Sequence, residues 1–386
     1  MRLNSIFVIG AAAPALAKKL FDVPHGAVAK VSIIDSTVRF GPGTPDFLFV
    51  TPKLEGFDEV PTLPSLSFLI ESPTGKKAVF DLAVPKDALN SSAPAVLEAL
   101  AASGFAFSVE KNVADILKDG GVDPTSINSI IWSHYHYDHT GDINTFPKAT
   151  ELVVGPGFSK AYLPGYPTNP NSTLLDKWFE DRTVREIPFT TSLKAGPFRA
   201  YDFFSDGSFY LLDTPGHTVG HLAGLARTSA NPDTFIFMGG DLCHYSGHIR
   251  PSPYKPIPPN IKVPLPGSDS HSHSHPHGPA IPCPGAVTAK EFEYLNIKRN
   301  RKPDAPFFDP VLGEDLPLMK ETIVKAETAD GDSDVWFVVA HDPKILEVAE
   351  VFPKSANAWK KKGWGEKAHW KFLRDLVPAV KVDRET

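Results

Sequence analysis

The stretch IIWSHYHYDH, residues 130–139, places three histidines and one aspartate within six residues, directly after an apolar run. β-Branched and aromatic residues that end in a polar cluster predict a buried strand that opens into a loop at its C-terminal end. His134 and His136, two residues apart, are spaced to reach one metal ion, and Asp138 and His139 to reach a second. Only 14 of the 386 residues are histidine, so a metal site is favoured over a chance cluster in a polar loop.

Three further apolar runs each deliver a candidate ligand where a strand would stop. They are Tyr210–Leu212 before His217, Thr234–Met238 before Asp241, and Val335–Val339 before His341. Four strand ends that converge on one edge of a sheet would hold the rigid side-chain arrangement that a reactive metal centre requires. Each of these histidines alone would be interpreted as an ordinary loop residue, and the repeated order of strand and ligand is what predicts the site.

The segments SHYHYDHTGD, DTPGHTVGH, MGGDLCH and VVAHD, in this order, resemble the successive metal-binding motifs of the metallo-β-lactamase superfamily. The resemblance runs from about Val31 to about Val351, nearly the whole chain. It implies an α+β fold, the four-layer αββα sandwich, with the site at one edge of two packed sheets. It also implies one metal ion held by His134, His136 and His217, a second held by Asp138, His139 and His341, and Asp241 as the bridge between them.

Position 241 distinguishes branches of that superfamily. The true β-lactamases carry cysteine or serine there, whereas an aspartate such as Asp241 is typical of glyoxalase II-like thioesterases, lactonases and related hydrolases. The segments 241–244 and 247–252 resemble most the N-acyl homoserine lactone lactonase-like branch. Those lactonases carry a tyrosine three residues after the bridging aspartate, where it contacts the substrate carbonyl, but this chain has His244 there and Tyr245 next.

The ligand set predicts a dinuclear metal-dependent hydrolase, in which a metal-bridged hydroxide attacks an ester-type carbonyl. The resemblance to the lactonase-like branch implies that this carbonyl belongs to a lactone or similar cyclic ester. Two divalent ions ~3.5–4 Å apart can share that hydroxide, because coordination lowers the pKa of water from about 15.7 to about 7. Histidine and aspartate ligands suit zinc first, with manganese and iron as alternatives. Asp241 is expected to act as ligand and proton shuttle, and His244 or Tyr245 as a donor to the oxyanion. The candidate catalytic residues are therefore Asp138, Asp241, His244 and Tyr245.

Three other functions stay open on the sequence. The nearest is the hydrolysis of a lactam, a linear ester or a thioester by the same site. The second is a mononuclear iron sulfur dioxygenase, which shares the HxHxDH core and would bind one iron per chain and consume oxygen. The third is a non-enzymatic metal-binding scaffold, which the complete set of seven ligands disfavours.

Several polar residues near these motifs are expected to support the site rather than to bind metal. His221 is expected to form a hydrogen bond in the core beside the ligands. Asp81 either orients a ligand or ends a strand in a simple turn. His248 and Arg250 either line the pocket or order their loop, and His369 is expected at the surface.

Composition indicates one compact enzyme domain, residues 18–386, with a loop insertion at about 250–285. Hydrophobic residues make up 42% of the chain, enough for a large core. The net charge of −6 does not indicate the excess of lysine and arginine that is typical of proteins that bind nucleic acid. No apolar run reaches the ~18 residues of a transmembrane helix. The expected partner is a small carbonyl compound, and the oligomeric state is not predicted.

Proline accounts for 38 residues, many of them between 250 and 284, where hydrophobic periodicity disappears. This pattern predicts a long extended loop, which we expect to border the pocket because it leaves the metal edge. The tract His271–His277 within it is expected to be a solvated tip rather than a metal site. A second loop, 155–170, offers Tyr162 and Tyr166 either as pocket wall or as packing beneath the loop.

Residues 1–17 combine one arginine, an apolar stretch and a small-residue cleavage pattern, which is typical of a signal peptide, with an N-terminal helix as the alternative. Sequons at Asn90 and Asn171, and a disulfide between Cys243 and Cys283, would suit an oxidising compartment. Secretion is therefore favoured over a cytoplasmic location.

The remaining sequence is typical of alternating strands and helices. Strands are expected at Val31–Ile34, Ser67–Ile70 and Ala78–Leu82. Helices are expected at Ala93–Ala102, Val113–Leu117 and Ala358–Leu376, the last with its aromatic residues docked and its lysines in solvent.

Overall fold

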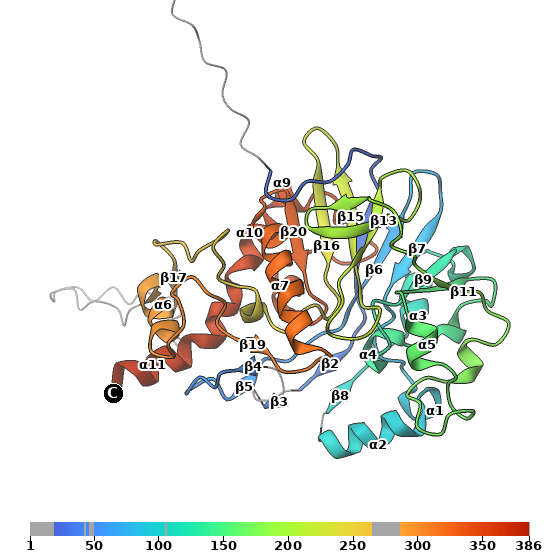
Figure 1. Cartoon of the computed structure of the whole chain (residues 1–386), viewed down its shortest axis with the longest axis horizontal. Coiled ribbons are helices and arrows are strands. Elements are labelled where there is room, and N and C mark those ends of the chain that lie inside the picture. Colours follow the sequence, from blue (N-terminus) through green and yellow to red (C-terminus); the bar gives the residue numbers. More distant parts are fainter. Residues whose placement is uncertain (1–18, 42–43, 46–49, 105, 265–285, 386) are drawn as a thin grey trace, which may run out of the picture.

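Two six-stranded β-sheets face each other at the centre of the molecule, and helices cover their outer faces (Figure 1). The computed structural model describes residues 19–385 apart from 42–43, 46–49, 105 and 265–285. The predicted leader, 1–17, and the tract His271–His277 lie outside the described residues.

The first sheet contains the strand that precedes the histidine cluster. Its order is β1-β6-β7-β9-β10-β11, antiparallel from β1 to β7 and parallel from β7 to β11. The carboxyl ends of β7 and β9 therefore reach the same edge. The strands expected at 31–34 and 67–70 lie inside β1 and β6, and β7 ends earlier than predicted, because Asp81 has a positive φ of 61°. The strands span Lys30–Asp35 (β1), Leu66–Glu71 (β6), Lys77–Phe80 (β7), Ser129–Ile131 (β9), Glu151–Val154 (β10) and Val184–Glu186 (β11).

The second sheet contains the three other predicted strands that lead to ligands. Its order is β12-β13-β14-β15-β16-β20, antiparallel except for the parallel pair of β16 and β20. That pair sends two strand ends to one edge, as the sequence predicted. The strands span Lys194–Ala195 (β12), Phe198–Asp202 (β13), Phe209–Asp213 (β14), Leu222–Ser229 (β15), Thr234–Met238 (β16) and Val335–Val338 (β20).

Successive residues of each strand face opposite layers of the molecule. In β6, Phe68 packs into the core between the sheets, and Leu69 packs into the outer core of the first sheet. In β16, Ile236 packs into the inner core, and Phe237 into the outer core of the second sheet. Three apolar layers thus separate helix, sheet, sheet and helix, and the predicted αββα sandwich is confirmed.

Helix α7, Leu316–Gly331, covers the outer face of the second sheet (Figure 1). Its buried residues Met319, Ile323, Ala326 and Ala329 recur every three or four positions and form one apolar stripe. The helix begins at Asp315, whose carboxylate accepts a hydrogen bond from Leu318 N at 3.0 Å. The opposite layer contains α3, Val113–Asp119, and α5, Phe158–Tyr162.

Helix α2, Pro94–Ser103, agrees with the helix expected at 93–102. Proline stands in its first turn, and Gly104 ends it with a φ of 67°, a conformation that favours glycine. Only Val96 of α2 is fully buried, so most of this apolar helix is left to form the wall of a cavity. Other short helices of the sandwich are α1 (Ala88–Ser91), α4 (Tyr137–Thr140), α8 (Pro343–Leu346), η2 (Pro124–Ser126), η3 (Ile143–Thr145), η4 (Asp176–Trp178) and η5 (Ser246–His248).

A further apolar cluster, called the side cluster here, lies beside the sandwich and includes Phe57, Val263, Phe292 and Leu376. Residues 250–264, the described part of the proline-rich loop, contribute Ile257 and Val263 to it, and none of them lines the cavity described below. The expectation that the loop borders the pocket is therefore wrong for these residues, because their apolar side chains are buried elsewhere. Elements of this region are β2 (Arg39–Phe40), β3 (Thr44–Pro45), β4 (Val50–Thr51), β5 (Glu59–Val60), β8 (Phe107–Ser108), β17 (Lys262–Val263), β18 (Val287–Thr288), β19 (Asp309–Pro310), α6 (Ala289–Ile297) and α11 (Val377–Glu385).

The C-terminal segment is not the single helix that was predicted for Ala358–Leu376. Gly363, with a φ of 67°, breaks it, and the chain continues in a new direction. Trp359 and Trp364 pack into the inner core, so the expectation that the aromatic residues dock is confirmed. The segment divides into α9 (Trp359–Lys362), α10 (Trp364–His369) and η6 (Lys371–Leu376).

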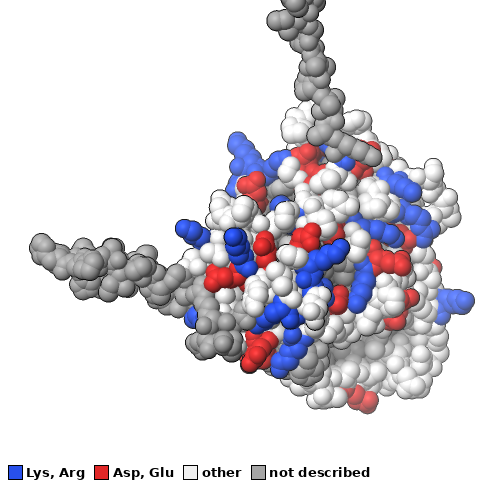
Figure 2. Space-filling view, turned by 60° about the vertical axis from the view of Figure 1, so that its left-hand side comes forward, with Lys and Arg blue, Asp and Glu red and all other residues white. Residues whose placement is uncertain are grey.

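Charged side chains of both signs are interspersed over the face shown in Figure 2. That face has no continuous basic patch of the kind that binds nucleic acid. Within the described residues, no helix combines the length and the apolar character needed to cross a bilayer.

Candidate metal centre

Four strand ends bring the predicted ligands to one edge of the sandwich. Residues 134–139 follow β9, and the other ligands follow β14, β16 and β20. All seven lie in two groups whose ligand atoms are within 4.8 Å of one another. The groups are His134, His136, His217 and Asp241, and Asp138, His139, Asp241 and His341.

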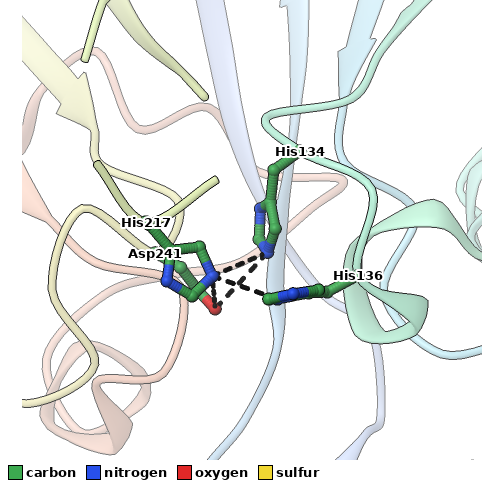
Figure 3. Close-up of side chains that lie close together, drawn as sticks. All are labelled: His134, His136, His217 and Asp241. Carbon is green, nitrogen blue, oxygen red and sulfur yellow. Dashed lines mark hydrogen bonds and ion pairs between the residues drawn. The ribbon is translucent and has the colours of Figure 1, made fainter. Parts of the chain in front are cut away.

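The side chains of the first cluster, His134, His136, His217 and Asp241, point toward one another (Figure 3). His217 Nε2 lies 3.2 Å from His134 Nε2 and 3.0 Å from His136 Nδ1. Asp241 Oδ2 lies 3.7 Å from His134 Nε2 and 3.6 Å from His217 Nε2. Four ligands bound tetrahedrally to zinc at ~2.0–2.1 Å would stand about 3.3 Å apart, so this spacing suits one such ion.

The second cluster, Asp138, His139, Asp241 and His341, has a similar spacing. Asp241 Oδ1 lies 3.1 Å from His139 Nε2 and 3.0 Å from His341 Nε2. Asp138 Oδ2 lies 3.8 Å from His139 Nε2 and 3.5 Å from His341 Nε2. Two imidazoles and two carboxylates thus face one point.

Asp241 belongs to both clusters, because its two oxygens face different ways. Oδ2 faces the first cluster and Oδ1 faces the second. Asp241 Oδ1 and His139 Nε2 are buried, and neither forms a hydrogen bond of acceptable geometry within the described residues. Buried polar atoms require a partner, and a cation between them would supply it. The two clusters are therefore consistent with a dinuclear metal site.

The protonation of the imidazoles agrees with this assignment. Burial and neighbouring imidazoles lower the pKa of His134 and of His217 well below the ordinary value, and burial lowers the pKa of His136. All three rings are therefore neutral at pH 7, the form that binds metal. Burial alone would also lower the pKa of His139, but nearby carboxylates, Asp241 foremost, raise it well above the ordinary value. A divalent cation would displace this proton from His139.

In three of the histidine ligands, the ring nitrogen that does not face the cluster, Nδ1, forms a hydrogen bond. Each such bond leaves the Nε2 lone pair facing its cluster, and it sets the ring orientation. The Nδ1 atoms donate as follows: His139 to Asp81 Oδ2 at 2.8 Å, His341 to Pro64 O at 2.7 Å, and His217 to Leu312 O at 3.4 Å.

Of the two roles that the sequence left open for Asp81, the contact with His139 supports the orientation of a ligand. Its replacement gives a measurable expectation. Asp81→Asn keeps the shape of the side chain but loses the charge that faces His139 Nδ1. We expect the affinity for the second ion to fall about 10–100-fold, with the first ion retained. A competitive chelator titration measures both ions. Asp119→Asn, in an exposed ion pair with Lys111, is the control, and equal affinities in all three proteins would contradict the expectation.

His221 also supports the site from the core, as the sequence predicted. Its Nδ1 donates to Thr214 O at 3.0 Å, and its Nε2 accepts from Asp241 N at 3.2 Å. Burial lowers the pKa of His221 to about 3. The ring is therefore neutral, so one nitrogen can donate a hydrogen bond while the other accepts one. His221 therefore fixes the backbone of the bridging aspartate.

His244 and Tyr245 face opposite directions, because the backbone at Tyr245 is extended (φ −141°, ψ 140°). His244 lines the cavity, and its Nε2 lies 3.3 Å from Asp241 Oδ2. The ring of Tyr245 is buried in the side cluster, with its hydroxyl 3.4 Å from Asp375 Oδ2. The prediction that Tyr245 donates to the oxyanion is therefore wrong, and His244 is the member of this pair that can reach a substrate.

Arg250 does not line the cavity but anchors the loop that follows Asp241. Its guanidinium pairs with Asp330 at 2.7 Å and donates to Ser246 Oγ at 3.2 Å and to His369 O at 3.1 Å. His369 is buried beside this pair, so the prediction that it lies at the surface is wrong. The reason is a long-range contact, since Arg250 and His369 come together only in the fold.

Removal of Asp330 would leave the Arg250 guanidinium buried without a counter-charge. We expect Asp330→Ala to lower the free energy of unfolding by about 3–5 kcal/mol, and the double replacement Arg250→Met with Asp330→Leu to lower it less. Urea unfolding followed by fluorescence measures both. A loss below about 1 kcal/mol in Asp330→Ala, the range of exposed pairs, would show that the pair does not anchor the loop.

Cys243 and His248 are buried, and neither lines the cavity. Burial raises the pKa of the Cys243 thiol, so it stays protonated and does not suit a metal ligand. Cys243 has no disulfide partner among the described residues, and Cys283, its predicted partner, lies outside them.

A cavity of about 510 Å³ lies over the two clusters. Its floor is polar and includes ligands of both clusters, while most of its wall is apolar. Such a cavity suits a small carbonyl compound with an apolar substituent. The wall includes Phe40, Leu63, Val96, Ala99 and Leu100, and the exposed rim includes Leu312, Gly313 and Glu314.

The wall from α2 and the rim at 312–314 were not predicted. Neither segment contains a histidine, a cysteine or a repeated motif, and both lie far along the chain from the ligands they approach. Only the fold brings them to the site.

Comparison with known proteins agrees with this geometry. A family model described as the metallo-beta-lactamase superfamily matches residues 60–239. The gamma-lactamase FDB1 of Fusarium pseudograminearum (strain CS3096) is 39% identical over 359 residues, 90% of this chain and 82% of that protein. The metallo-hydrolase mfmC of Annulohypoxylon moriforme is 38% identical over 86% of this chain and 84% of that protein.

A solved structure of a quorum-quenching N-acyl homoserine lactone hydrolase has the same fold. It covers 85% of this chain and 98% of its own, with a TM-score of 0.52 and 17% identity. The paired clusters, the fold and the relatives agree that this protein is a metal-dependent hydrolase. The chain belongs to the metallo-beta-lactamase superfamily.

Proposed function

We propose that this chain opens the ring of a small cyclic amide or ester by hydrolysis, with a γ-lactam as the leading substrate class and a lactone as the second. The observation that carries the proposal is Asp241, which presents one oxygen to each cluster at the floor of the cavity. Such a bridge supports a pair of divalent ions, zinc first, with manganese and iron as alternatives.

The choice of a lactam differs from the lactone that the sequence motifs favoured. The relative named a gamma-lactamase shares 39% of its residues over most of both chains. The lactone hydrolase shares 17% and supports the fold alone. The higher sequence identity to the gamma-lactamase, over 90% of this chain, therefore favours the lactam as substrate. The motif at Asp241, which resembles that of the lactonases, supports the lactone as the second candidate.

The residues of the chain suggest how the ring would open. When bound, two divalent ions would lower the pKa of a water molecule and polarise the substrate carbonyl. The carboxylates of Asp138 and Asp241 line the cavity floor and can accept the proton that the water loses. His244 Nε2, 3.3 Å from Asp241 Oδ2, can hold that proton and return it to the leaving atom.

The chemistry balances without a further reactant. Hydroxyl adds to the carbonyl carbon, and the bond from that carbon to the ring nitrogen or oxygen breaks. The leaving atom takes the proton, so the product carries a carboxylic acid and an amine or alcohol. The apolar wall, with Val96 and Leu100 of α2, would hold the rest of the substrate while its carbonyl stays at the floor.

The test compares a γ-lactam and a γ-lactone with the same apolar substituent, incubated with protein that holds two zinc ions per chain. We expect the lactam to gain one water molecule, measured by mass spectrometry. Opening of the lactone alone would favour the second candidate. No opening of either ring would contradict the proposal, and one iron per chain with oxygen consumption would favour the sulfur dioxygenase.

A further inference from the structure

Residues 312–315, called the strap here, join the rim of the cavity to the loop that contains His217. Glu314 N donates to His217 O at 2.9 Å, and Asp315 N donates to Gly216 O at 2.9 Å. In return, His217 Nδ1 donates to Leu312 O at 3.4 Å. The strap is therefore fixed relative to the metal centre, and so is any side chain that it carries.

The carboxylate of Glu314 is fixed by neutral donors. It accepts from Val219 N at 2.8 Å and from the Tyr162 hydroxyl at 3.0 Å. Tyr135 and Tyr162 stack with ring centroids 3.9 Å apart, which limits their movement. Tyr135 and Glu314 line the cavity. Tyr162, which the sequence offered either as pocket wall or as packing beneath its loop, is not among the lining residues and contacts these two.

The Glu314 carboxylate has no cationic partner among the residues that the structure describes. Among the described residues, no lysine, arginine or histidine nitrogen lies within 4.0 Å of the Glu314 oxygens, whereas Asp309 and Asp330 each pair with an arginine. Glu314 therefore places a carboxylate, without a cationic partner among the described residues, where the cavity meets solvent.

Apart from the metal clusters and His244, the polar side chains of the described cavity lining that could approach an anion are the hydroxyl groups of Ser103, Tyr135, Tyr137 and Thr173. The described lining residues include no lysine or arginine. The carboxylates of Asp138 and Asp241 belong to the two ligand clusters and would not attract an anion, and the wall from α2 and Phe40 is apolar. A substrate with a negatively charged substituent would thus find no lysine or arginine among the described lining residues, and it would meet Glu314 on entry.

We propose that Glu314 is a specificity-determining residue that excludes substrates with an anionic substituent, so that the site takes uncharged, apolar ring compounds. The inference rests on the proposed function, because it concerns the substrate of that same site. Two negative charges several ångströms apart at a partly hydrated rim repel each other enough to lower kcat/KM about tenfold. Salt would weaken this repulsion, because the rim is exposed.

The test uses two ring compounds of the class that the wild-type protein opens, one with a neutral carboxamide substituent and one with a carboxylate at the same position. Glu314→Gln keeps the shape and a hydrogen-bond acceptor but removes the charge. Glu321→Gln, on an exposed turn of α7, removes the same charge away from the cavity and is the matched control. We expect Glu314→Gln to raise kcat/KM for the carboxylate compound about tenfold relative to the amide, and Glu321→Gln to change the ratio less than twofold.

A second measurement needs no variant. In the wild-type protein, the preference for the neutral compound should shrink as sodium chloride rises from about 0.05 M to about 0.5 M. An unchanged ratio in Glu314→Gln together with a salt-independent preference would overturn the role of Glu314. Failure of the wild-type protein to open either ring would instead overturn the proposed function, so the two failures are distinguishable.

Discussion

Replacement of Asp241 by asparagine is expected to remove both metal ions and to lower hydrolysis by about 10³-fold or more, equivalent to about 4 kcal/mol. Among the described residues, this carboxylate is the only side chain that belongs to both clusters, with Oδ2 facing His217 and Oδ1 facing His139. The amide of asparagine has the same shape as the carboxylate but no charge. Its NH2 group would replace one of the two oxygens and direct hydrogens at an imidazole nitrogen. Metal analysis and ring-opening rates of the purified variant measure both effects.

Asp138→Asn is the matched control for this experiment, because Asp138 belongs to the second cluster alone. We expect this variant to lose or weaken one ion and to keep the other. If Asp241→Asn retained two ions per chain, or lost no more metal than Asp138→Asn, the bridging role of Asp241 would be wrong.

Replacement of His244 by alanine is expected to lower kcat by about 10²–10³-fold while two ions stay bound. His244 lines the cavity 3.3 Å from the bridging carboxylate, yet it belongs to neither ligand group. Its loss would remove a proton donor near the reacting carbonyl without a change in the ligand set. Steady-state kinetics and metal analysis on the same preparation separate these effects.

His244→Tyr is the informative companion variant, because the lactonase-like branch that the motifs resemble carries tyrosine at this position. A hydroxyl that replaces the imidazole as donor should restore part of the activity lost in His244→Ala. Loss of metal in His244→Ala would contradict the donor role and make His244 part of the metal centre.

The ligands could be predicted from the sequence because each signal is local. An apolar run such as Ile130–Trp132 marks a buried strand, and a histidine or aspartate directly after it marks the sheet edge. The parallel pairing of β16 and β20 then places Asp241 and His341 side by side, which the repeated pattern had implied. His221 was found because it lies within one of those motifs, and Asp81 was a candidate because it directly follows another apolar run, Ala78–Phe80.

The surroundings of the ligands could not be predicted, because they depend on contacts between distant segments. His244 and Tyr245 are adjacent, and only the extended backbone of the fold decides which one faces the substrate. His369 appeared isolated in the sequence but is buried against Arg250 and Asp330. Glu314, 97 positions after His217, carries no motif and reaches the site only through the strap.

The metal content of the purified protein, measured by elemental analysis together with protein concentration, tests the central claim most directly. Seven ligand side chains in two clusters that share Asp241 predict two divalent ions per chain. His341→Ala, which alters the second cluster alone, should lower this number by one. A single ion per chain in the wild-type protein, unchanged in His341→Ala, would contradict the dinuclear account.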